Sequence, residues 1–285
     1  VLAIIALIAI GSATRVMEAG LACPDWPLCY GTFLPLNHMN LRVFLEWFHR
    51  LDAFLVGILI LLQCVLSLVW RKFLPLWIPK IYSFLVFLII FQGILGALTV
   101  INMLSSVIVM SHLFIAFVLL ITSIYINQNL SIREFEGRKF WWKFLLAIPL
   151  ILTLIQSVIG VRLSSTWSAH LCLTVNQNCF VLNSHKLFAI PVFISITSII
   201  LVSLIKYELF KNNWKFLSSI FLLLVLQITL GIFTLKTNLS EPLIIISHQI
   251  VASLLVATLT TLIFRTSNEN TVFNSNKNKV MLGFN

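Results

Sequence analysis

The chain has 285 residues, of which 60% are hydrophobic and only 10% are charged, and its mean hydropathy is +1.04. These values lie outside the usual range of soluble domains and predict an integral membrane protein. The net charge of +10 requires no nucleic-acid partner, because membrane proteins collect basic residues in cytoplasmic loops beside anionic lipid headgroups.

Eight apolar stretches are candidates for membrane helices, and their lengths do not suit the short alternating strands of a membrane barrel. We therefore predict an all-α integral membrane fold with eight transmembrane helices. The first stretch is short and the chain opens with Val1, so we expect a missing N-terminal piece rather than a cleaved signal peptide. The Asn-rich segment 266–285 cannot build a core and is expected to be a disordered cytoplasmic tail. The eight stretches are 1–15, 45–69, 77–101, 106–127, 141–163, 183–205, 214–236 and 242–264.

Basic residues gather in alternate connections between these stretches. The connections near 70–80, 128–143 and 206–215, with the segment after 264, hold 13 of the 19 basic residues. By the positive-inside rule these connections face the cytoplasm, as do both termini, in a multi-pass protein of the cell membrane. The 13 residues are Arg71, Lys72, Lys80, Arg133, Arg138, Lys139, Lys143, Lys206, Lys211, Lys215, Arg265, Lys277 and Lys279.

Two of the outer connections each carry a close pair of cysteines. We expect disulfides in both loops, because the outer compartment is oxidising and the spacings are short. The alternative is a metal site that combines one cysteine pair with His38 or His170. The first pair, Cys23 with Cys29, is either a structural staple or a redox-active disulfide, whereas a structural role is favoured for the second. Cys64 lies inside a span and is expected to pack. The two pairs are Cys23 with Cys29 and Cys172 with Cys179.

Four histidines are spaced as two copies of one pattern. His49 and His112 are 63 residues apart, as are His185 and His248, and the second pair follows the first by 136 residues. We expect all four near the outer starts of the second, fourth, sixth and eighth helices. Intramembrane ionisable residues are rare and usually functional, so we predict paired axial ligands of heme iron within helical bundles. Non-heme iron or copper would require further carboxylate or sulfur ligands.

A second repeated pattern supports a duplication. A glutamine precedes a glycine by four residues in the third, fifth and seventh stretches, and a leucine replaces the glutamine in the first. Small residues at this spacing promote close helix packing in membranes, so packing is favoured over ligand contact for the glutamines. We predict two homologous four-helix halves, residues 1–136 and 137–265. The four pairs are Leu7 with Gly11, Gln92 with Gly96, Gln156 with Gly160 and Gln227 with Gly231.

The segment RVMEAGLACPDWPLCYGTFLP at 15–35, followed by EWFHR at 46–50, resembles heme A synthase. The resemblance covers essentially the whole chain, including the eight spans, the outer cysteine pairs and the histidines of the even spans. It implies that the enzyme completes heme A for cytochrome oxidases. The methyl group at C8 of heme O is oxidised to a formyl group through successive hydroxylations, with oxygen taken from water.

The resemblance also implies different roles for the two halves. His185 and His248 are expected to hold a resident heme B, whereas His49 and His112 surround the substrate heme O. Heme O synthase and cytochrome oxidase assembly factors are candidate partners, besides membrane lipid, and the sequence does not identify the electron acceptor. The sequence also leaves open whether the histidines pair within or between the halves.

Glu46 is the candidate catalytic residue. It precedes His49 by three positions and therefore shares a helix face with it. Its carboxylate could stabilise a cationic intermediate or accept a proton from attacking water. The structural alternative is an ion pair with Arg50, together with a favourable position in the first helical turn. Outer basic residues are candidates to bind heme propionates. They are Arg15, Arg42, Arg50, Arg162, Lys186 and Lys236.

Two other functions remain possible on sequence grounds. A two-heme electron-transfer cytochrome of the b type would share the histidine pairs. It would not require a carboxylate beside only one pair, and Leu182 stands where Glu46 would recur. A heme transporter would need exchangeable ligation at both sites. The hemes that co-purify with the protein distinguish the synthase from the cytochrome.

Overall fold

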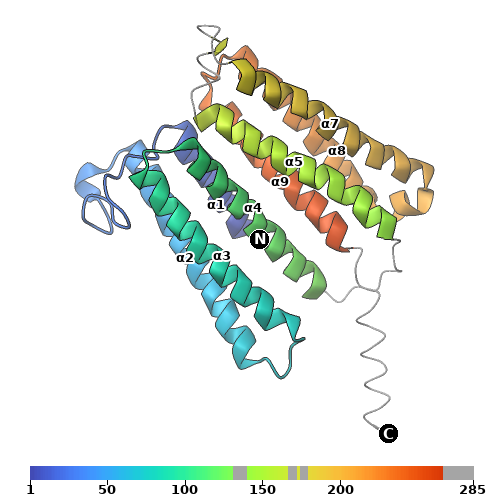
Figure 1. Ribbon diagram of the computed structural model, residues 1–285, viewed down its shortest axis with the longest axis horizontal. Helices are drawn as coiled ribbons and strands as arrows, with labels where there is room; N and C mark the ends of the chain where they lie inside the picture. Colours follow the sequence, from blue (N-terminus) through green and yellow to red (C-terminus); the bar gives the residue numbers. More distant parts are fainter. Residues whose placement is uncertain (131–139, 166–171, 174–178, 266–285) are drawn as a thin grey trace.

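The computed structural model describes residues 1–130, 140–165, 172–173 and 179–265 (Figure 1). Within these ranges the chain forms eight long helices and one short 3-10 helix, with no strand beyond an isolated bridge in the first loop. The tail 266–285 and His170 lie outside the described residues. The elements are α1 (Leu2–Val16), η1 (Leu36–His38), α2 (Leu41–Val69), α3 (Trp77–Ile101), α4 (Ser106–Leu130), α5 (Phe140–Ser165), α7 (Cys179–Ile205), α8 (Tyr207–Lys236) and α9 (Pro242–Arg265).

Seven of the helices in the described ranges are long and apolar enough to cross a membrane, which confirms an all-helical multi-pass protein. The remaining helix, α1, has 15 residues. At a rise of 1.5 Å per residue it covers about 22 Å, less than the roughly 30 Å of a bilayer core. Large apolar side chains cover the outer faces of the long helices, as at Leu62, Phe87 and Leu222. Lipid is the solvent that fits such surfaces.

The helices pack in two sets of consecutive neighbours. In the first, α1 contacts α2, α2 contacts α3, α3 contacts α4, and α4 returns to α1; in the second, α5, α7, α8 and α9 close in the same way. Figure 1 shows the two sets side by side. They meet where α9 packs on α1 and α4, and where α4 packs on α5. One continuous core crosses this junction and includes Phe117, Trp142 and Leu259. Within each set, α2 lies diagonally opposite α4, and α7 opposite α9.

Of the helices that carry the four histidines, α2 and α7 begin four residues earlier than the predicted stretches, whereas α4 and α9 begin where predicted. The side chain of Asn40 accepts hydrogen bonds from the amides of Arg42 and Val43, at 3.0 and 3.1 Å, and so caps α2 four residues before the expected start. His49 is therefore the ninth residue of α2. The other three histidines are each the seventh residue of their helices, so all four lie about two turns inside rather than in the first turn.

Candidate functional site

Each of the four histidines faces a glycine of the preceding long helix, and the glycine provides the room that the imidazole occupies. A methyl group built on the glycine would lie 2.9 to 3.5 Å from the imidazole carbon Cε1, and contacts below 3.4 Å are tighter than ordinary packing. The glycine of the repeated motif is therefore part of the histidine's environment. The methyl-to-Cε1 distances are 2.9 Å for Gly11 and His49, 3.5 Å for Gly96 and His112, 2.9 Å for Gly160 and His185, and 3.2 Å for Gly231 and His248.

The glutamines of the same motif contact the same histidines. Gln92 and Gln156 donate from Nε2 to the backbone carbonyls of the histidines they face, at 2.9 and 2.8 Å. In the second set, Gln156 Nε2 also lies 3.4 Å from His185 Nε2. Gln227 Nε2 lies 3.2 Å from His248 Nε2. These amides join neighbouring helices, as expected for packing, and in the second set they also orient an imidazole ring. On α1 the corresponding residue is Leu7, which has no such group.

The structure brings the histidines together within the sets. The ring centroids of His185 and His248 are 6.4 Å apart, with a T-shaped arrangement. Two imidazoles that bind one metal from opposite sides, through bonds of about 2 Å, have centroids roughly 6 Å apart. His49 and His112 lie near enough to interact electrostatically. Both pairs thus join diagonally opposite helices, α7 with α9 and α2 with α4, and point towards the interior of a set.

The donor set fits a bis-imidazole heme better than a metal held by the protein alone. Nδ1 of each of the four histidines is buried and has no hydrogen-bond partner among the described residues. Within those residues, no cluster of three or more His, Cys, Asp or Glu side chains is arranged to hold a metal ion. A group that needs only two protein ligands and brings its own equatorial ligands matches this arrangement.

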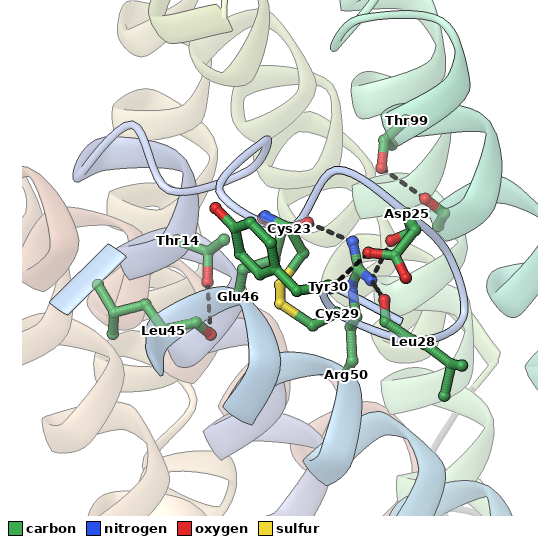
Figure 2. Close-up of polar contacts among 11 residues, drawn as sticks. Thr14, Cys23, Asp25, Leu28, Cys29, Tyr30, Leu45, Glu46, Arg50 and Thr99 are labelled. Atoms are coloured by element: carbon green, nitrogen blue, oxygen red, sulfur yellow. Dashed lines mark hydrogen bonds and ion pairs between the residues drawn. A yellow bond between two sulfur atoms is a disulfide. The ribbon is translucent and has the colours of Figure 1, made fainter. Parts of the chain in front are cut away.

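Glu46 is buried beneath the loop that carries Cys23 and Cys29 (Figure 2). Its Oε2 accepts a hydrogen bond from the Cys23 amide at 2.8 Å, and its Oε1 accepts one from Arg50 Nη2 at 2.5 Å. Arg50 Nη1 in turn donates to the carbonyls of Asp25 and Leu28. The predicted ion pair with Arg50 therefore exists, but it is largely buried and clamps the cysteine loop to α2. The carboxylate lies one helical turn from His49.

The structure confirms both disulfides, Cys23 with Cys29 and Cys172 with Cys179. The first is buried and packs against Val43 of α2. Its sulfur atoms are consumed, and His38 instead stacks on Tyr30, with ring centroids 4.0 Å apart. The proposed cysteine and histidine metal site is therefore absent from the first loop. Cys64 is a free, buried cysteine, as expected from packing.

Asp25 organises the turn inside the first disulfide loop. Its carboxylate accepts hydrogen bonds from the amides of Tyr30 at 2.6 Å and Gly31 at 2.8 Å. Gly31 has a φ of +70°, a conformation that favours glycine. The hydrogen bond from Gly31 is the main cause that lowers the pKa of Asp25 from its ordinary value, with the Tyr30 amide and the charge of Arg50 contributing in the same direction.

Three polar residues on α1 and α2, the helices that bring Gly11 and His49 together, have buried atoms without partners among the described residues. They are Ser12 and Arg15 on α1 and Asp52 on α2, with Oγ, Nε and Oδ2 unpaired among the described residues. The sequence identified Arg15 only as one of several outer basic residues. It could not select Arg15, because that selection depends on the other arginines being engaged. Arg42 pairs with Glu18 at 3.5 Å, and Arg50 is held in the clamp.

Comparisons with known proteins agree with this arrangement. The family model for cytochrome oxidase assembly protein, COX15-CtaA, matches residues 1–260. A heme A synthase of Shewanella oneidensis is 30% identical, over 90% of this chain and 91% of that protein. A heme A synthase of Exiguobacterium sibiricum is 32% identical over 57% of this chain and 55% of the relative. That of Shouchella clausii is 39% identical over 30% of this chain and 28% of the relative.

Proposed function

Because the chain belongs to the COX15-CtaA family of cytochrome oxidase assembly proteins, we propose that it is a heme A synthase, an oxidoreductase that converts heme O to heme A. The observation that carries the proposal is a duplicated pair of half-buried histidines, each facing a helical glycine, with a buried carboxylate beside only one pair. The relatives named heme A synthase support the same activity.

The proposed architecture is eight transmembrane helices in two homologous four-helix halves, residues 1–136 and 137–265. The helices contact one another in the same sequence in both sets, which supports this architecture. The repeated pairing of glycine with histidine supports it as well. The eighth span is α1. The cysteine loops face outward, where disulfides persist, and both termini, with the tail 266–285, face the cytoplasm.

The two halves have different tasks in this proposal. His185 and His248 would hold a resident heme B, which would supply one-electron redox chemistry when bound. His49 and His112 hold the substrate heme O. The glutamine amides near both Nε2 atoms of the second pair support a permanently oriented site. The first pair lacks those ring contacts.

Glu46 supplies the chemical difference between the halves. The equivalent residue in the second half, Leu182, is buried to the same degree, at 2% exposure against 4% for Glu46, so the position is internal in both halves but charged in only one. Hydroxylation of a methyl group with oxygen from water releases two protons and two electrons. A buried carboxylate can accept a proton or stabilise positive charge on the carbon. The Cys23 amide and Arg50 fix the orientation of this carboxylate.

Pigment analysis tests the assignment. Heme B accompanied by heme O, a hydroxylated heme or heme A should be extracted from the protein purified from cells that make heme O. Heme B alone would instead mark an electron-transfer cytochrome. Loss of both hemes on exchange with a soluble acceptor would favour a heme transporter.

Replacement of Glu46 tests the chemistry. Glu46→Gln retains the shape and an acceptor for the Cys23 amide but removes the charge. We expect both hemes to bind while heme A formation falls at least tenfold, on the scale of about 2 kcal/mol or more for a charge-stabilising group. Glu18→Gln is the matched control, because Glu18 forms an exposed ion pair with Arg42 and such pairs contribute about 0–1 kcal/mol. Near-normal heme A formation by Glu46→Gln, with heme content unchanged, would assign Glu46 to loop anchoring alone.

A further inference from the structure

Arg15 is half-buried, and its guanidinium has no partner among the described residues. It lies in the last turn of α1, and its Nε is buried without a partner. Its side chain makes no hydrogen bond or ion pair with any residue in the described ranges. Burial of a cation without a partner is costly, because the charge loses hydration and gains nothing in return. A favourable interaction with the helix dipole does not require the guanidinium to be buried.

Arg15 lies on the face of α1 that packs towards the first histidine pair. It follows Gly11 by four residues, so both lie on the same face of α1. Gly11 is the glycine that faces the imidazole of His49, with a methyl-to-Cε1 distance of 2.9 Å. The chain of α1 runs towards the cysteine loop. Arg15 therefore lies one helical turn from the imidazole level, on the side of the outer loop.

The other three copies of the motif do not have this arginine. Four residues after the glycines that face the remaining histidines, the chain has Val100, Ser164 and Leu235. Arg162 and Lys236 lie in the last turns of α5 and α8, but not at this distance from the glycine. The position one helical turn after the glycine is therefore basic only beside the site formed by His49 and His112.

The other arginines near this site are already engaged. Arg42 pairs with Glu18, and both side chains are exposed. Arg50 is bound to Glu46 and to two carbonyls of the cysteine loop. Only Arg15 among these three offers an unoccupied guanidinium, whose planar donor array suits a carboxylate.

We propose that Arg15 binds a carboxylate of the porphyrin that occupies the site between His49 and His112. The proposal rests on the proposed function, because it takes a heme as the ligand of that site. Arg15 is then a positioning residue: it fixes the rotation of the macrocycle about the iron axis, and so determines which edge faces Glu46.

The test is a spectral titration of the purified protein, with its C-terminal heme retained, using ferric protoporphyrin IX and its dimethyl ester. Binding at the N-terminal site is the absorption change that disappears in His112→Ala. For each protein we compare the ratio of the two affinities, because that ratio cancels the partitioning of each ligand into detergent. The variants are Arg15→Gln and Arg15→Lys, and Arg42→Gln is the matched control for loss of an outer charge.

We expect the wild-type protein and Arg42→Gln to prefer the free acid at least tenfold. Arg15→Gln should lose this preference through weaker binding of the acid, with ester binding unchanged, and Arg15→Lys should retain part of it. Retention of the C-terminal heme spectrum reports correct folding of each variant. An unchanged preference in Arg15→Gln would overturn the role of Arg15. Absence of any His112-dependent binding in the wild-type protein would contradict the proposed function itself, and the role of Arg15 with it.

Discussion

Gly160→Ala tests whether the glycines of the repeated motif create the histidine sites. The added methyl group would lie 2.9 Å from Cε1 of His185, whereas carbon atoms pack at about 3.5–4.0 Å. Between about 0.6 and 1.1 Å of overlap must therefore be relieved. The contact is to the end of a side chain, so the imidazole moves before the backbone does. Overpacking of about 1–3 kcal/mol is partly offset by the roughly 1 kcal/mol that alanine gains over glycine in a helix.

The fold should therefore survive, and heme binding should not. A ligating group must be held within about 0.5 Å of its productive position, so we expect heme B to dissociate at least tenfold faster, equivalent to about 1.4 kcal/mol. The assay is heme transfer from purified protein to excess apomyoglobin, together with the low-spin absorption spectrum. Gly231→Ala, at 3.2 Å from His248, should have a smaller effect. Gly93→Ala, whose methyl group meets nothing within 4 Å, is the neutral control. Heme retention in Gly160→Ala equal to that in Gly93→Ala would refute the reasoning.

Two further predictions concern the loop that carries Cys23 and Cys29. Without reductant, Cys23 and Cys29 should resist a membrane-impermeant alkylating reagent added from the outer side, and should react after reduction; alkylation of both in the unreduced protein would contradict the disulfide. Because the pKa of Asp25 is lowered in the folded loop, its ionised form stabilises the turn above its ordinary pKa of 3.8. That contribution is lost as the pH falls through the lowered value. The amides of Tyr30 and Gly31 should therefore lose protection from hydrogen exchange below about pH 4. Asp25→Asn should remove this pH dependence. The same pH profile in the wild-type protein and in Asp25→Asn would exclude Asp25 as its cause.

Much of the fold could be predicted from the chain, because lipid allows few backbone solutions. Long apolar stretches therefore identified the helices directly. The start of α2 was missed by four residues, since it depends on Asn40, a polar cap that precedes the apolar stretch. The depth of His49 was misjudged for the same reason. Because α1 is short, hydropathy alone does not identify it as a membrane span. Its packing against α2, α4 and α9 is what places it among the membrane helices.

The candidate site was predictable in its ligands and less so in its environment. The spacing of His185 and His248 survives in the sequence because both copies of the repeat keep it. The role of Gly160 was visible only as a packing motif, since its contact with His185 joins residues of different helices. The ion pair of Glu46 with Arg50 was predicted from their spacing, but its second partner could not be inferred, because the Cys23 amide comes from an irregular loop whose backbone carries no periodic signal.

The central claim is that two histidine pairs of common origin perform different tasks, and heme analysis of four single variants tests it most directly. Proteins carrying His49→Ala, His112→Ala, His185→Ala or His248→Ala are purified from cells that make heme O. Their hemes are then extracted and identified. We predict that His185→Ala and His248→Ala lose tightly bound heme B. Replacement of either N-terminal histidine should leave the heme B spectrum largely intact and abolish heme A. Equal loss of the same heme from all four variants would contradict the division into a cofactor half and a substrate half.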